Sequence, residues 1–376
     1  MKRLNGNTID NKDESLDNFE EFNEKDILSF DKSYEFYVND PQEYYEIISK
    51  LGKFQKGIVF FDKIINFNPN HGLAYFYKGN CLNKLDKFPE AIVCFDKVID
   101  LDKNFTSAYR NKAICLNDSQ KFEEALIVFD KLIEIDPNNK QAYHIRGHSL
   151  SGLGKFHDAI ICYDKAIEFD SNDDNLHNDK GDSLKGLGKY EEAIVCFDKA
   201  IEINPTKLIS YKNKGVSLHN LGKYEEALVC FDKAIEINSN DGILYILKGM
   251  SFYVLGKVEE TIACCNKLIE LNPNNSDAYF YKGNCLFNIE NYQEAMVCFN
   301  RMIEINPYES NGYTRKALVL KNWGKYEEAI ICLDKAIELD PNDKASYKNK
   351  AECLNKLGKF QEALIFFNMG NELDPS

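Results

Sequence analysis

The chain has 376 residues, 28% of them charged, and a formal net charge of −14. Because nucleic acids and anionic membrane surfaces are themselves polyanions, this charge argues against both as partners and favours neutral or basic protein segments. No apolar run approaches the roughly 20 residues that span a bilayer, so we expect no membrane insertion and a cytoplasmic location.

Residues 1–26 are polar, acidic and poor in aliphatic side chains, which is the composition of a disordered tail. The segment Ile27–Phe36, "ILSFDKSYEF", then imitates "IVCFDKAIEI" from later in the chain. We therefore predict a capping helix over 27–37, in the form of a degenerate half repeat.

From residue 38 to 376 the sequence repeats with a period of 34 residues. Ten copies fit: 38–71, 72–105, 106–139, 140–173, 174–207, 208–241, 242–275, 276–309, 310–343 and 344–376. A period of this length indicates one array in which each unit contacts its neighbours.

Positions within a unit are numbered 1 to 34, so that Leu208 is position 1 of repeat six. Positions 3, 4, 7, 8, 10, 11 and 14 share one face of a helical wheel and are mostly apolar or small, which predicts an amphipathic first helix, closed by a left-handed glycine such as Gly222. A second helix begins at "YEEA", and a proline such as Pro205 ends it.

Small residues indicate where the two helices of a unit meet. In repeats two to ten position 8 is glycine or alanine, as in Gly215, and position 20 is alanine in most units, as in Ala227. These residues permit close backbone approach while the aromatic side chain at position 24 fills the adjacent gap.

Together these features resemble the tetratricopeptide repeat, and the resemblance covers about nine-tenths of the chain. It implies an all-α, right-handed superhelical solenoid of about ten helix-turn-helix repeats, with the first helices lining a concave groove. It also implies a non-enzymatic protein–protein interaction scaffold or adaptor that binds peptide segments in that groove.

Two positions depart from the family pattern. In repeats two to ten position 7 is lysine or arginine where the family commonly has leucine, and we expect its charged groups to reach acidic residues such as Asp198 or Glu202. Position 22 is valine or isoleucine on the outer face of the second helix. We favour the interpretation that the aliphatic stems of lysine side chains half cover this row. The alternative is that the row forms a convex ridge through which the protein associates with other molecules.

Positions 2, 5, 6, 9, 12 and 13 form the face predicted to line the groove. Repeats seven and eight are apolar there, which predicts an anchor for an apolar or amphipathic peptide. The predicted peptide-binding residues are Ile243, Ile246, Leu247, Met250, Tyr253, Phe280, Tyr281, Asn284 and Phe287. The alternative is that the superhelix itself or the acidic tail covers this face. Thr261, Cys265 and Val258 also break the packing pattern of repeat seven, so we expect local mobility there.

Elsewhere the same face is polar and mixed. His144 and His148 lie one helical turn apart, with Asp182 expected on the next first helix. A histidine pair at this spacing without the glutamate of an HExxH motif is a weak metal signal, so we interpret the pair as ordinary surface polarity and predict no metal site.

Cysteines and catalytic motifs give no further site. Eleven of the twelve cysteines fall on two repeat positions, which predicts reduced, buried packing residues rather than disulfides or zinc ligands. No phosphate-binding loop or nucleophile motif is present, so we predict no enzyme activity and no cofactor.

A second class of function remains open at this point. The last repeat, from Lys344, is followed by no further capping helix in the sequence, so its apolar face is expected to be uncovered. The alternative to a peptide-binding scaffold is therefore a structural or self-assembling subunit of a larger complex.

Overall fold

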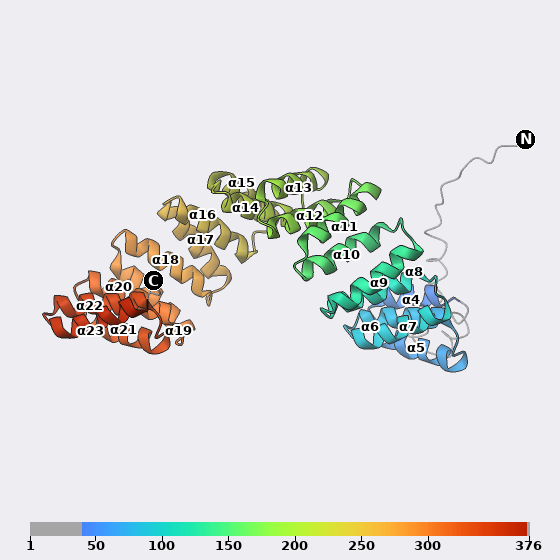
Figure 1. Cartoon of the computed structure of the whole chain (residues 1–376), viewed down its shortest axis with the longest axis horizontal. Coiled ribbons are helices and arrows are strands. Elements are labelled where there is room, and N and C mark those ends of the chain that lie inside the picture. The colour runs from blue at the N-terminus through green and yellow to red at the C-terminus, as the bar shows by residue number, and fades with distance from the viewer. Residues whose placement is uncertain (1–39, 374–376) are drawn as a thin grey trace, which may run out of the picture. The chain divides into compact units, whose positions relative to one another are not determined.

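A computed structural model describes residues 40–373, which form twenty α-helices and no strand (Figure 1). The all-α prediction is confirmed over this range. The predicted tail (1–26) and capping helix (27–37) lie outside the described residues.

The chain divides into two compact units between Leu187 and Gly188. The helices of the first unit are α4 (Pro41–Leu51), α5 (Phe54–Phe67), α6 (Gly72–Asn83), α7 (Phe88–Leu101), α8 (Thr106–Asp118), α9 (Phe122–Ile135), α10 (Lys140–Gly152), α11 (Phe156–Phe169) and α12 (Asp174–Gly186). Those of the second are α13 (Tyr190–Ile203), α14 (Leu208–Asn220), α15 (Tyr224–Ile237), α16 (Gly242–Val254), α17 (Val258–Leu271), α18 (Ser276–Asn288), α19 (Tyr292–Ile305), α20 (Ser310–Asn322), α21 (Tyr326–Leu339), α22 (Lys344–Lys356) and α23 (Phe360–Glu372).

Within each unit every helix packs against the next one along the chain. Successive first helices also touch directly, as α10 touches α12 in the first unit and α16 touches α18 in the second. This second kind of contact brings together residues that lie about one repeat apart in the sequence.

Where position 8 is glycine and position 24 is aromatic, the contact between the helices of one repeat depends on the missing side chain of the glycine. A Cβ atom added to Gly215 would lie 2.6 Å from the ring of Phe231, and one added to Gly79 would lie 2.7 Å from the ring of Phe95. Both rings are fully buried, so glycine leaves the space that they fill.

Contacts of a position-7 cation connect most repeats to the one before. The position-7 cation donates to the position-25 side chain of the preceding repeat, as in Lys214 to Asp198 (2.5 Å). Glu202, the other predicted partner, instead accepts from Lys199 within its own helix. The same pairing joins Lys78 to Asp62, Lys112 to Asp96, Arg146 to Asp130, Lys180 to Asp164, Lys248 to Asp232, Lys282 to Asn266 and Lys350 to Asp334.

The turn between the two helices adopts the left-handed conformation throughout the described repeats, with glycine in seven of them. Asp86, Gln120 and Glu290 take its place elsewhere, with φ between 57° and 61°. The glycine pattern alone did not reveal these three turns.

The outer row at position 22 is more open than expected. Its side chains are 50–69% exposed in Val59, Val93, Ile127, Ile161, Val195, Val229, Val297, Ile331 and Ile365. Neighbouring lysine stems therefore cover less than half of most of them. The cysteines agree with the prediction, since all twelve are free and ten are buried.

Adding a single methyl group by a glycine-to-alanine substitution tests the contact between the two helices of a repeat. Gly215→Ala forces the Phe231 ring to move, whereas in Gly249→Ala the nearest atom, Cβ of Cys264, lies 3.4 Å away in ordinary contact. Alanine favours a helix over glycine by about 1 kcal/mol. We expect Gly249→Ala to raise the local free energy of unfolding of its repeat by up to about 1 kcal/mol. The effect of Gly215→Ala on this free energy should be less favourable than that by about 1 kcal/mol or more, because the Phe231 ring must move.

Amide hydrogen exchange across α14–α17 measures both variants repeat by repeat, which suits an array that need not unfold in one step. Ala113 shows that the fold accepts a methyl at this position when the facing ring, Phe129, is placed for it. Equal stabilisation by both substitutions would show that the Phe231 ring adapts without cost.

Candidate functional site

The predicted peptide-binding residues lie on α16 and α18, in the second unit. Ile243 and Tyr253 are exposed, whereas Asn284 is buried. Ile246, Leu247, Met250, Phe280, Tyr281 and Phe287 are half-buried. These residues other than Asn284 are called the apolar face below. Val254 extends it with 54% of its side chain exposed.

Ring contacts within the apolar face connect its helices. The ring of Tyr253 on α16 meets that of Tyr281 on α18 edge-on, with centroids 5.8 Å apart. Tyr281 in turn meets Phe280 at 5.3 Å, and the guanidinium of Arg315 on α20 lies 5.1 Å from the Phe280 ring centroid. Burial raises the pKa of the Tyr281 phenol. These contacts hold three first helices in one continuous surface.

Arg315 is a functional candidate that the sequence interpretation missed. Its Nε atom is buried and has no hydrogen-bond partner among the described residues. Arg315 also lines a pocket of about 320 Å³ on α20 and α22, together with Ser310, Asn311, Thr314, Leu318, Asp343, Ala345 and Asn349. One sequence feature could have revealed Arg315. It occupies position 6 of its repeat, beside the aromatic residue at position 5 of the repeat before.

The polar side chains on the surfaces of repeats three and four largely form hydrogen bonds with other side chains of the same chain. Arg110 donates to Gln141 (2.7 Å), and Asn111 donates to Asn80 (2.8 Å). Ser149 donates to the side-chain oxygen of Asn117 (2.7 Å). Such pairs leave fewer free groups for a ligand than the sequence pattern indicated.

Thr261 and Cys265, two of the residues that break the packing pattern of repeat seven, are buried in the structure. Thr261 is fully buried, and its hydroxyl donates to the carbonyl oxygen of Lys257 (2.8 Å). Cys265 is also buried in place of the usual aromatic residue. The predicted local mobility of this repeat stays a prediction.

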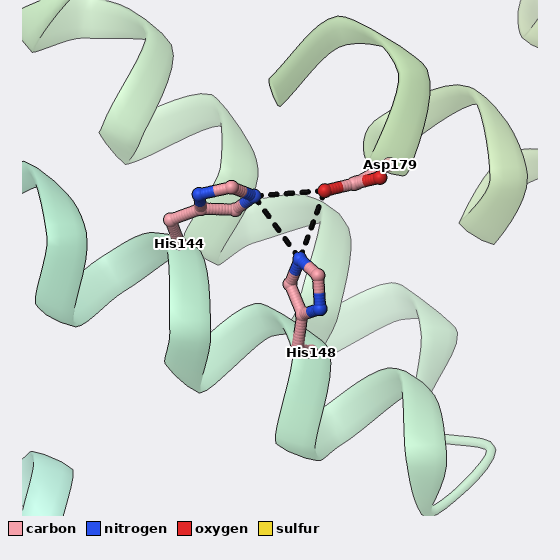
Figure 2. A group of neighbouring side chains, drawn as sticks. All are labelled: His144, His148 and Asp179. Atoms are coloured by element: carbon pink, nitrogen blue, oxygen red, sulfur yellow. Dashed lines mark hydrogen bonds and ion pairs between the residues drawn. The ribbon is translucent and has the colours of Figure 1, made fainter. Parts of the chain in front are cut away.

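Two histidines and an aspartate form a separate cluster in the first unit (Figure 2). His144 and His148 lie on adjacent turns of α10 and point toward Asp179 on α12. Each Nε2 atom lies 2.8 Å from Oδ2 of Asp179, and the two Nε2 atoms lie 3.0 Å apart. The expected partner, Asp182, is instead paired with Lys185 at 2.6 Å.

The Asp179 carboxyl is held in its charged form. Burial alone would raise its pKa, but the hydrogen bonds from His144 and His148 outweigh burial and hold that pKa well below its usual range. Its second oxygen, Oδ1, accepts from Nδ2 of Asn178 at 3.2 Å.

No helix within residues 40–373 is long and apolar enough to cross a membrane. Models of the tetratricopeptide repeat match residues 72–105, 106–139, 140–173, 175–207, 209–241, 243–275, 276–309, 310–343 and 332–365. Among curated proteins nothing matches.

Several solved structures are similar to parts of the chain. YrrB, described as a TPR protein with an unusual peptide-binding site, is 26% identical over 49% of this chain and 95% of its own, with a TM-score of 0.44. MamA is 22% identical over 42% and 93%, with a TM-score of 0.41. A tetratricopeptide repeat protein from Parabacteroides merdae is 18% identical over 66% and 99%, with a TM-score of 0.49.

Proposed function

The chain belongs to the tetratricopeptide repeat family, and we propose that it is a non-enzymatic scaffold that binds peptide segments of other proteins on the apolar face of repeats seven and eight. A cytoplasmic location is part of this proposal. It is supported by the twelve free cysteines, which are typical of reducing compartments.

The observation that carries the proposal is the apolar face itself. It combines exposed aliphatic and aromatic groups, Ile243 and Tyr253, with half-buried neighbours that hold them in place. Leu247 packs against the core of repeat six, and Phe280 packs against that of repeat eight. An anchored surface of this kind binds apolar side chains with little ordering cost, because its own rotamers are already restricted.

The neighbouring pocket indicates the rest of the ligand. Arg315 offers hydrogen-bond donors beside the Phe280 ring, while Asn311 supplies an amide along the pocket wall. We therefore expect a segment that places apolar side chains on α16 and α18 and a carbonyl or carboxylate oxygen near Arg315.

Peptide selection on the full chain tests this site. We expect peptides chosen from a random displayed library to share apolar residues at a fixed spacing. In the variant Ile243→Glu with Tyr253→Glu their dissociation constants, measured by fluorescence anisotropy, should rise at least about tenfold, because two anchors become charged. Both residues are exposed, so the helices should persist.

The matched control is Val229→Glu with Val297→Glu, which places the same charges on exposed apolar positions of the outer row. Its affinities should equal those of the wild-type chain. Peptides that bind the first variant and the wild type equally well would remove the apolar face as the site.

A second candidate function, self-association through the C-terminal repeat, is favoured by the exposed face of α23. Leu364 and Phe367 are 60% and 48% exposed, whereas their equivalents in repeat six, Leu228 and Phe231, are buried. In repeat six the next repeat packs over α15. A pocket of about 320 Å³ opens on the same side of α22 and α23, lined in part by Asn355 and Phe360. We propose that a second copy of the chain covers this face in a symmetric contact.

Sedimentation equilibrium distinguishes this candidate from a monomeric scaffold. The wild-type chain should show a concentration-dependent dimer, and Leu364→Glu with Phe367→Glu should remain monomeric, because charge on a buried apolar contact is strongly unfavourable. Val229→Glu again serves as the control and should still dimerise. A wild-type chain that stays monomeric at the highest attainable concentration contradicts self-association and leaves the peptide-binding proposal untouched.

A further inference from the structure

We propose that His144, His148 and Asp179 form a binding site for a divalent transition-metal ion of the zinc type, with one coordination position left open to solvent. The proposal is independent of the peptide-binding function. It rests on three ligand atoms that converge from two helices of the first unit (Figure 2).

Counting protons shows that hydrogen bonding alone does not account for the cluster. Nε2 of His144, Nε2 of His148 and Oδ2 of Asp179 form a triangle with edges of 2.8, 2.8 and 3.0 Å. Each Nε2 carries at most one proton and the carboxylate carries none. If both protons point to Oδ2, the two nitrogens face each other at 3.0 Å with no proton between them.

A metal ion satisfies all three atoms at once. Zinc binds imidazole nitrogen and carboxylate oxygen at about 2.0–2.2 Å. A point that far from all three corners of this triangle exists just outside its plane, so one ion can contact the three atoms together. Three protein ligands with water in the fourth position is the arrangement of open zinc sites.

The surrounding residues hold the three ligands in position. Helical spacing of four residues places both imidazoles on one face of α10. Beneath them lies the ring of Tyr163, edge-on to each imidazole with centroids 6.0 Å away. Tyr163 is buried, and Gly147 makes room for it, since a Cβ there would lie 2.5 Å from its ring. Asn178 donates to the free oxygen of the Asp179 carboxylate.

The ligand types indicate which metals fit. Imidazole suits zinc, copper, nickel and cobalt, whereas magnesium and calcium prefer sites made of oxygen atoms alone. Asp179 is largely shielded, but half of the His148 side chain is exposed, so an ion has a path from solvent. The open position would hold water or a donor group from another molecule.

Zinc titration of the untagged, chelator-treated full chain, followed by calorimetry, tests the site. We expect one equivalent to bind. His148→Gln, and separately Asp179→Asn, should each weaken binding by at least about tenfold, and the double variant His144→Gln with His148→Gln by at least about 100-fold, because even loss of an outer-sphere partner costs 10–100-fold. His157→Gln removes an exposed histidine of α11 and should leave the affinity unchanged.

Cobalt(II) gives a second readout that separates this site from the twelve thiols. Its bound form should show visible d–d bands without thiolate charge-transfer absorption, and the bands should vanish in the double histidine variant. Circular dichroism checks that each variant keeps its helices; Asp179→Asn is nearly isosteric and keeps the test valid if a histidine variant unfolds. Binding that is equal in the wild type, Asp179→Asn and the histidine variants, or that appears only at millimolar zinc, overturns the proposal.

Discussion

In repeats that carry glycine at position 8 and an aromatic residue at position 24, the close approach of the two determines how the helices of the repeat meet. Gly147 faces Tyr163, Gly215 faces Phe231 and Gly283 faces Phe299, and in each pair an added Cβ would come within 2.6 Å of the ring. A contact this tight permits little change in the angle or axial shift of the helix pair. In those repeats the outward direction of the other positions follows from it, including positions 5 and 9 of repeat four, which carry His144 and His148.

The pairing between repeats adds the second constraint. With the position-7 cation held by the preceding repeat in repeats two to eight and in repeat ten, successive first helices lie side by side, and residues 31 to 35 apart in sequence become neighbours. A surface pair such as Lys214 with Asp198 contributes little free energy by itself, because the carboxylate is about half exposed. The pair matters because it is repeated. The same geometry recurs along each unit, so the contacts together set one alignment of the first helices.

The repeat, the helix pairs, the free cysteines and the Lys214–Asp198 contact could be predicted from the sequence, because each follows from periodicity within a unit. The partner of His144 and His148 could not. Asp179 and Asp182 lie one helical turn apart on the same face of α12, and only the axial shift between α10 and α12 decides which one reaches the histidines. The burial of Asn284 escaped prediction similarly, since a helical wheel shows direction and not what the neighbouring helices cover.

The two candidate sites use the same three positions of the repeat. Positions 5 and 9 of one first helix and position 6 of the next are His144, His148 and Asp179 in one place, and Ile246, Met250 and Tyr281 in another. The glycine-to-ring contact and the charged pairs involve other positions, so side chains in this triplet change with little effect on folding. That separation lets one backbone arrangement present metal-binding chemistry in the first unit and an apolar surface in the second.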